Sequence, residues 1–172
     1  MQTSTSVLRA AAVADLPAII ALDQAIFGEY GAAEDPAVIR ARLTVFPGGC
    51  VVLVAPTASA ESDPLLGYLT TEKWDKAREP ALDEDPWITH KPAGLVLNIT
   101  TLAVGQSYQG RGYGEQLLHA AIEIARRERC TQIILETARA ERFYLRHGFT
   151  KIGERQQRGI LLHIMGLMLD KT

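Results

Sequence analysis

The segment of this sequence best suited to chemistry is a glycine-rich hexapeptide. Its residues are Gln109, Gly110, Arg111, Gly112, Tyr113 and Gly114. An apolar run ending Leu102, Ala103, Val104 precedes it, and an amphipathic stretch follows. The first amides of a helix lack partners within the helix and carry about half a positive charge, and glycines let an anion approach the backbone closely. We therefore predict a loop that binds phosphate at the start of a helix, with Arg111 as an additional cation.

Other phosphate-binding loops fit this segment less well. A Walker A loop requires GxxxxGK[ST], which does not occur here. A dinucleotide fingerprint requires GxGxxG, but the third glycine, Gly114, comes one residue early. Glu136 would be the ribose-binding acid of such a fold, yet too little chain follows it for the usual second half. A nucleotide-binding domain for NAD or ATP and a turn that binds nothing remain as alternatives.

The residue that would accept a proton during catalysis is less clearly indicated. Glu136, His90 and Glu72 carry groups that could act as a base, and a chain of water molecules is the alternative. His119 and His147 lie on predicted helices and are interpreted as surface or packing residues. His163 lies on a predicted strand and is interpreted as a histidine with satisfied hydrogen bonds.

Hydrophobic periodicity predicts the elements that position these residues. Apolar runs predict strands at residues 7–11, 51–55, 65–74, 95–104, 132–137, 149–153 and 160–169. Helical spacing predicts helices at residues 15–27, 36–46, 113–128 and 139–147, with Asp15 as a cap and Asp35-Pro36 opening the second. Residues 60–64 are expected to form a turn and residues 75–92 a long loop or short helical insertion. This order predicts an α/β (α+β) domain with a mixed sheet flanked by helices.

Within the strand at residues 95–104, alternation predicts which side chains share a face. Val96, Asn98, Thr100 and Leu102 are expected on one face, and the residues between them on the other.

The composition is that of an ordinary globular domain. The 172 residues, 47% of them hydrophobic, suffice for one domain with a substantial core. Eighteen basic and twenty acidic side chains give a net charge of −2, which argues against nucleic acid as a partner. The chain lacks an apolar run of membrane-spanning length, and residues 1–6 do not resemble a secretory signal, so we expect a cytoplasmic protein without membrane association. Cys50 and Cys130 lack CxxC partners, which predicts buried thiols and no metal site.

Two motifs resemble the GCN5-related N-acetyltransferase (GNAT) superfamily. The run Q-x-x-G-x-G, here Gln109, Gly112 and Gly114, is similar to the acetyl-coenzyme A site of that superfamily. Residues 142–149, with the sequence RFYLRHGF, are similar to its FYxxxGF segment. The resemblance covers about residues 95–153. It implies a mixed, mostly antiparallel central sheet of six to seven strands flanked by about four helices, in a single domain spanning residues 1–172.

The resemblance also implies how acetyl-CoA would bind. The backbone of Leu102, Ala103 and Val104 would pair with the pantetheine arm, and the amides of residues 109–114 would hold the pyrophosphate. Tyr144 falls where the family often places a tyrosine that protonates the departing thiolate. That role is chemically sensible, because a thiol and a phenol differ by only about 1.5 pKa units.

A second, narrower resemblance is to the arylalkylamine N-acetyltransferase branch, through residues 74–79 and 90–92. In that branch two histidines on the strand before the loop relay protons. This sequence has Asn98 and Thr100 in those places. These two side chains could hold a water molecule, although neither is a base near neutral pH.

The expected function is transfer of an acetyl group from acetyl-CoA to a primary amine of a small molecule or peptide, by direct attack in a ternary complex without a metal. The alternative is a catalytically weak acyl-CoA-binding sensor or partner module. The acidic residues Asp83, Glu84 and Asp85 could attract a cationic amine, but the acceptor itself is not indicated. The apolar run at residues 160–169 could pair across a homodimer.

Overall fold

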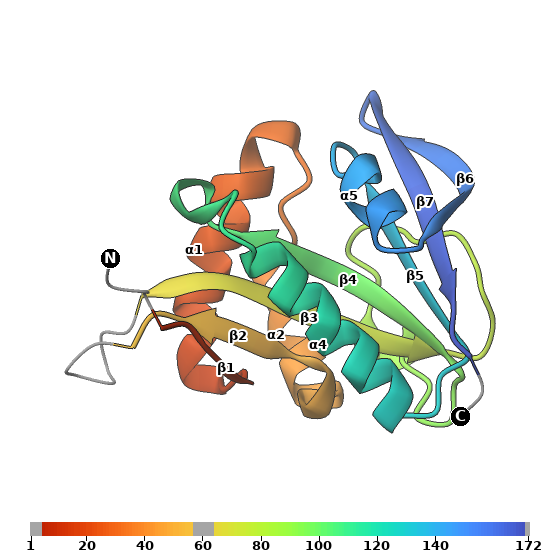
Figure 1. The fold of residues 1–172 in the computed structure, drawn as a ribbon, viewed down its shortest axis with the longest axis horizontal. Helices are drawn as coiled ribbons and strands as arrows, with labels where there is room; N and C mark the ends of the chain where they lie inside the picture. The colour runs from red at the N-terminus through yellow and green to blue at the C-terminus, as the bar shows by residue number, and fades with distance from the viewer. Residues whose placement is uncertain (1–4, 57–63, 171–172) are drawn as a thin grey trace.

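The computed structural model describes residues 5–56 and 64–170, which form a seven-stranded sheet with helices on both faces (Figure 1). The strands are β1 (Val7–Ala10), β2 (Val51–Val54), β3 (Leu65–Trp74), β4 (Val96–Val104), β5 (Gln132–Thr137), β6 (Thr150–Gln157) and β7 (Ile160–Met168). Their order across the sheet is β1-β2-β3-β4-β5-β7-β6. Neighbouring strands are antiparallel except β4 and β5, which run parallel. The turn predicted at residues 60–64 lies, apart from Pro64, outside the described residues.

Helices cover the two faces unequally. They are α1 (Leu16–Phe27), α2 (Pro36–Val45), α3 (Pro86–Thr89), α4 (Tyr113–Arg127) and α5 (Glu141–Arg146). Short 3₁₀ turns include η2 (Gly28–Tyr30) after α1 and η5 (Gln106–Tyr108) after β4. In Figure 1, α4 crosses the front of β3 and β4, whereas α1 and α2 lie behind the sheet. The molecule therefore has three layers.

Two large hydrophobic cores and a smaller cluster of Trp74, Val96, Ile134 and Ile164 hold these layers together in the described part of the chain. On the front face, α4 buries residues at helical spacing against the sheet, among them Leu117, Leu118, Ala121 and Ile124. The same core includes Tyr144 of α5, so α4 and α5 share a face. A second core joins α1 and α2 to the back of the sheet.

The two cysteines are buried free thiols, as predicted. Burial raises the pKa of both Cys50 and Cys130 to about 11, so both stay protonated and unreactive near neutral pH.

Helix caps agree with the sequence in one case and differ in the other. The Asp35 carboxylate accepts a hydrogen bond from the amide of Ala37 at 2.8 Å and caps α2, as predicted. Asp15 does not cap α1 through its side chain. Its carboxylate instead binds the guanidinium of Arg9 and the amide of Ala12, both at 2.7 Å, so its oxygens are occupied by the preceding segment.

The predicted fold class is confirmed, and the short helix α3 within residues 75–92 agrees with the predicted long loop or short helical insertion. Two details differ. β6 continues beyond the predicted residues 149–153 to Gln157, because its polar residues pair with β7 in a hairpin. The last strand, β7, lies between β5 and β6. The prediction that this strand pairs across a homodimer is therefore wrong, since both of its edges are already occupied.

A bulge in β4 determines which side chains face the site. Thr100 is an extra residue of β4 with no opposite residue in β3. Such a residue reverses the alternation of the strand beyond it. Ile99 and Leu102 consequently both pack toward α4, whereas Thr101 faces α1 and α2, where it binds Glu34. The predicted alternation is wrong beyond Thr100, because periodicity alone does not reveal an inserted residue.

Candidate active site between the splayed strands

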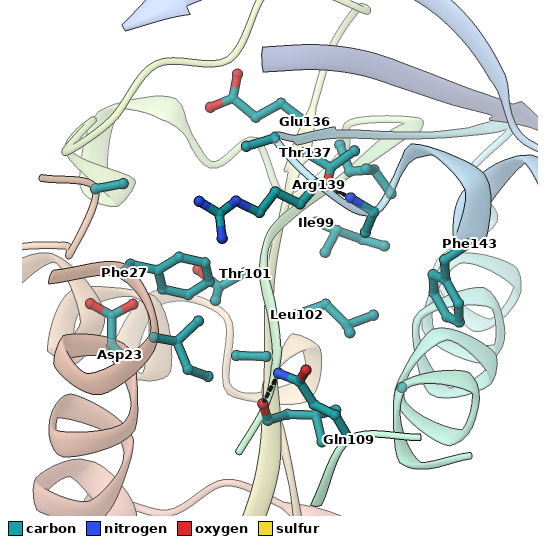
Figure 2. A pocket seen from close by; sticks show the side chains of 18 of the residues that line it. Asp23, Phe27, Ile99, Thr101, Leu102, Gln109, Glu136, Thr137, Arg139 and Phe143 are labelled. Carbon is teal, nitrogen blue, oxygen red and sulfur yellow. Dashed lines mark hydrogen bonds between the residues drawn. The ribbon is translucent and has the colours of Figure 1, made fainter. Parts of the chain in front are cut away.

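The candidate site is a cleft that opens where β4 and β5 separate. The two strands pair over only three residue pairs, and the last joins Asn98 to Ile134. Beyond this point they diverge around a cleft of about 970 Å³. Figure 2 shows β4 crossing the cleft, with α1 on one side and α5 on the other. Open crevices at strand ends are preferred ligand sites in such sheets.

The glycine-rich loop lies at the end of the cleft that leads into α4. Gly110 and Gly112 adopt φ values of 77° and 84°. A Cβ added to either would meet no atom within 4 Å. Within the described residues, the amides of residues 112–115 donate no hydrogen bond to the backbone. They are therefore available to an anion at the N-terminal end of a 15-residue helix.

Most of the residues predicted to bind the cofactor line this cleft: Leu102, Ala103, Val104, Gly110, Gly112, Tyr113 and Gly114. Gln109 also lines it, but its side-chain amide donates to the carbonyl of Val104 at 3.2 Å (Figure 2). This hydrogen bond therefore stabilises the end of β4. Arg111 is not among the lining residues, and its guanidinium lies 6.0 Å from the ring centroid of Tyr108.

The edge of β4 that faces the cleft is open. The amide of Gly105 donates to the carbonyl of Leu66 in β3 at 2.8 Å. Backbone groups alternate in direction along a strand, so the N–H and C=O groups of Leu102 and Val104 point to the other edge. Among the described residues, no strand pairs with that edge beyond Asn98. An extended ligand can therefore bind there as an added strand.

Tyr144 brings a phenol into the cleft from α5. Its ring makes edge contacts with Phe143 and Phe149, with centroids 5.0 and 5.4 Å away. The residue is only 5% exposed, yet it lines the cleft. No hydrogen-bond partner of its hydroxyl is present in residues 5–56 or 64–170. Burial raises the pKa of Tyr144 well above its ordinary value, so the phenol remains protonated and can donate a hydrogen bond.

Thr100 and Asn98 are placed differently from each other. Thr100 lines the cleft, and its hydroxyl lies 2.7 Å from that of Thr70. Asn98 is buried where the β4–β5 ladder is still closed, and it does not line the cleft. The structure therefore brings Thr100 and Tyr144 together with the cofactor loop, while Asn98 remains behind the closed end of the cleft.

The three predicted bases are all engaged in other contacts. Glu136 lines the cleft but forms a two-point ion pair with Arg155 of β6. Glu72 is buried, accepts hydrogen bonds from a tryptophan indole and a threonine hydroxyl, and does not line the cleft. The Nδ1 atom of His90, also outside the cleft, accepts from the amide of Lys73 at 3.0 Å. Burial lowers the pKa of His90, so its ring stays neutral in this structural role.

A buried polar cluster on the α1 side of the cleft was not predicted from the sequence. Asp23 accepts hydrogen bonds from the Tyr68 hydroxyl and from the amide of Glu34, both at 2.8 Å. Glu34 in turn binds Arg42 and the hydroxyl of Thr101. Both carboxylates line the cleft. The sequence contains a single signal, an aspartate as the one charged residue of a mostly apolar helix, but the partners of this aspartate come from distant segments.

Asp23 differs from Glu34 and Glu136, the other carboxylates lining the cleft that are buried or half-buried. Glu34 is paired with Arg42, and Glu136 with Arg155. Within the described residues no cation lies at ion-pair distance from Asp23, and its hydrogen-bond donors are neutral. Desolvation therefore raises the pKa of Asp23 above that of an ordinary aspartate.

The acidic run at residues 83–85 has structural partners. Asp83 accepts from the amide of Asp35 at 2.9 Å, and Glu84 binds Arg78 at 2.7 and 2.8 Å. Asp85 caps α3. These contacts account for the run without a bound amine.

The remaining histidines occupy three different settings. His119 is exposed on α4, as predicted. His147 packs on Phe143 and also lines the cleft. The interpretation of His163 as a satisfied strand histidine is wrong, because its Nδ1 atom is buried without a hydrogen-bond partner among the described residues.

The fold and the cleft agree with comparisons to known proteins, which define the class as acyltransferases. The model of the Acetyltransferase (GNAT) family matches residues 16–149. The chain belongs to this family. No curated protein matches it by sequence.

Solved structures show the same fold at low sequence identity. The loading GNATL domain of CurA from Lyngbya majuscula has a TM-score of 0.81 at 15% identity, covering 95% of this chain and 98% of that chain. Ard1 from Thermoplasma volcanium has a TM-score of 0.74 at 16% identity, covering 96% and 99%. Arabidopsis thaliana Naa50, in complex with the bisubstrate analogue CoA-Ac-MVNAL, has a TM-score of 0.71 at 14% identity, covering 95% and 99%. No helix in residues 5–56 or 64–170 is long and apolar enough to cross a membrane.

Proposed function

We propose that this protein is an N-acetyltransferase that transfers the acetyl group of acetyl-CoA to a primary amine of a small molecule or peptide, by direct attack in a ternary complex. One observation carries the proposal. Among the described residues, a single cleft combines amides at the start of α4 without backbone partners, an open strand edge on β4 and the unpartnered hydroxyl of Tyr144. These features suit a diphosphate, an arm that contains amides, and a thiolate, which are the successive parts of acetyl-CoA.

In this proposal the donor binds through the backbone. The amides of Gly112, Tyr113 and Gly114 hold the diphosphate at the positive end of α4. The pantetheine amides pair with the N–H of Val104 and the carbonyl of Leu102, because the carbonyl of Val104 already accepts from Gln109. The N–H of Leu102, farther from α4 along the open edge, can polarise the thioester carbonyl and stabilise the oxyanion that forms during attack.

Tyr144 would stabilise the departing thiolate. The hydroxyl donates a hydrogen bond to the sulfur as the C–S bond breaks and the thiolate forms. Burial raises the pKa of the Tyr144 phenol and widens its gap from a thiol in water. The same burial raises the pKa of a bound thiol, because desolvation penalises every anion. The hydrogen bond from Tyr144 therefore stabilises the departing thiolate even if complete transfer of the proton from the phenol to the sulfur is unfavourable.

The acceptor must lose a proton, because an alkylammonium has no lone pair with which to attack. We assign this proton to Asp23 as its final acceptor. Glu34 and Glu136 are each compensated by an arginine, whereas Asp23 is held by neutral donors only. The raised pKa of Asp23 also suits a base that works near neutral pH. Thr100 lines the same cleft as Asp23.

The test is turnover of acetyl-CoA with a panel of primary amines and peptides, followed by thiol release and mass spectrometry of the product. Wild type should acetylate at least one acceptor, and Tyr144→Phe should lower kcat about 10- to 100-fold while the Kd for coenzyme A changes less than twofold. An unchanged kcat in Tyr144→Phe would remove this residue from the reaction. Tight binding of coenzyme A without turnover of any acceptor would instead support the acyl-CoA-binding module, which the neutral Asn98 and Thr100 on β4 make the second candidate.

A further inference from the structure

We call the part of the cleft between the end of β5 and α1, away from the cofactor loop, the acceptor half. It contains a cation, Arg139, to which the proposed reaction assigns no role. Arg139 follows β5 and lines the cleft. Figure 2 shows its side chain crossing from the end of β5 toward the α1 side, where Phe27 lies. In the same view Gln109 of the cofactor loop lies at the opposite end. Arg139 is thus separated from the site proposed for the diphosphate.

Arg139 is held in place by an aromatic ring and a fixed turn. Its guanidinium carbon lies 4.1 Å from the ring centroid of Tyr30 in η2. The hydroxyl of Thr137 accepts a hydrogen bond from the amide of Ala140 at 2.9 Å, which fixes the turn that carries Arg139. A stacked guanidinium uses its faces for the aromatic contact and keeps its N–H donors at the edges. The donors of Arg139 are therefore oriented but not consumed.

The charges around Arg139 leave it without a partner. Within the described residues, no carboxylate forms an ion pair with it. Glu136, three residues earlier in the chain, is bound to Arg155 instead. Asp23 and Glu34 are held within the buried cluster on α1 and α2. A guanidinium that lines a ligand cleft and has no anion of its own is suited to bind an anion on the ligand.

The size and surroundings of the site favour a carboxylate. Arg139 supplies one positive charge, which matches a monoanion and a planar two-oxygen group. Glu29, the neighbour of Tyr30 in the chain, also lines the cleft, and its negative charge disfavours a dianion such as a phosphate ester more than a monoanion. The apolar residues Phe27, Leu82 and Ile160 also line the cleft and can contact the body of the acceptor.

A contact at the mouth of the cleft favours a small acceptor. The side chain of Arg158, at the tip of the β6–β7 hairpin, binds the carbonyl of Gly31 directly after η2. The contact of Arg139 with Tyr30 joins the end of β5 to the same turn. Two contacts therefore connect the opposite walls of the acceptor half. A small molecule can be enclosed there more readily than a segment of a folded protein.

We infer that the acceptor is an amino acid, whose carboxylate binds Arg139 while its amine faces the thioester near Leu102. This inference rests on the proposed acetyltransferase function and narrows its substrate class. Arg139 is a specificity-determining residue in this account. Its loss should raise the KM for an acid acceptor, with little effect on acetyl-CoA binding.

The experiment compares α- and ω-amino acids with their carboxamides, which keep the shape but lose the negative charge. In wild type, kcat/KM for at least one acid should exceed that for its carboxamide by about tenfold or more. Arg139→Gln should reduce this preference to within about twofold through the KM of the acid, and Arg139→Lys should restore part of it. Arg142→Gln, an exposed arginine on α5 outside the cleft, should keep the full preference.

Two further results separate failure of this inference from failure of the proposed function. If wild type acetylates carboxamides or simple amines as well as the acids, or if Arg139→Gln keeps the preference, the inference is wrong although the acetyltransferase function stands. If no acceptor is acetylated, the proposed function fails, and calorimetric titration of amino acids into the complex with coenzyme A still tests Arg139. Binding of an acid but not its amide, abolished in Arg139→Gln, would support the carboxylate site. Absence of binding in wild type would overturn it.

Discussion

Replacement of Gly112 by alanine tests the physical basis of the cofactor site. Gly112 precedes the first residue of α4 and has a φ of 84°, in the left-handed region that a side chain disfavours. An added Cβ would meet no protein atom within 4 Å, so the variant should fold. The backbone strain should cost about 1 kcal/mol of unfolding free energy.

The effect of Gly112→Ala on cofactor affinity should be larger than its effect on stability. The empty space beside Gly112 is where we place the diphosphate, so the new methyl group would displace charged hydrogen bonds worth about 1.5–3 kcal/mol each. Loss of one such contact corresponds to a Kd for coenzyme A raised about 10- to 100-fold. Isothermal titration with coenzyme A measures this change, and urea unfolding measures the stability.

Gly159→Ala is the matched control for this strain. Gly159 has a φ of 78° and also has no atom within 4 Å of an added Cβ, but it lies in the β6–β7 turn. It should lose a similar unfolding free energy without a change in the Kd for coenzyme A. If Gly112→Ala and Gly159→Ala bind coenzyme A equally well, the first turn of α4 does not hold the diphosphate and our account of the cleft is refuted.

Three other predictions concern the core, the proposed base and an ion pair. Leu117 is completely buried between α4 and the sheet, so Leu117→Ala should lower the free energy of unfolding by about 3 kcal/mol, as measured by urea denaturation. The control His119→Ala, on the exposed face of α4, should change this free energy by less than about 0.5 kcal/mol. In a pH profile of kcat/KM, wild type should show an ascending limb above the pKa of an ordinary aspartate, since burial raises the pKa of Asp23, and a profile unchanged in Asp23→Asn would exclude this base. The hydrogen bond from Lys73 lowers the pKa of Glu128 in the folded protein. The Lys73–Glu128 pair should therefore stabilise the fold by about 1 kcal/mol or less at any pH above 4.5, the pKa of glutamate in the unfolded chain. This stabilisation should disappear as the pH falls through the lower pKa of the folded state. Unfolding free energies measured from pH 7 to 2 should therefore converge for wild type and Glu128→Gln at the acid end, and a constant difference would contradict the assignment.

The sequence was sufficient to predict the elements whose signals are local. Strand and helix periods, the Asp35-Pro36 start of α2 and the glycines before α4 depend on interactions between near neighbours. The amides at the start of α4 likewise follow from helix geometry, whatever surrounds the helix. For this reason the cofactor loop and the order of elements could be predicted without knowledge of the packing.

The tertiary structure alone decided which side chains meet in the cleft. The bulge at Thr100 arises from the pairing of β4 with β3, and it turns Leu102 away from the face that alternation predicted. The separation of β4 and β5 leaves Asn98 behind the closed end and Thr100 in the cleft. The bulge and the strand separation both depend on how segments distant in the sequence pair. The local sequence of one segment does not specify the segment with which it pairs.

The same limit applies to the charged residues. Glu136 and His90 looked suitable as bases from their residue types, but Arg155 and Lys73 occupy them in the fold. Asp23 gave only a weak signal as one acid within an apolar helix. Residue type and spacing thus determined the elements and the cofactor loop, because these depend on local backbone physics. Tertiary packing determined which charges are compensated, and therefore which of them can take part in chemistry.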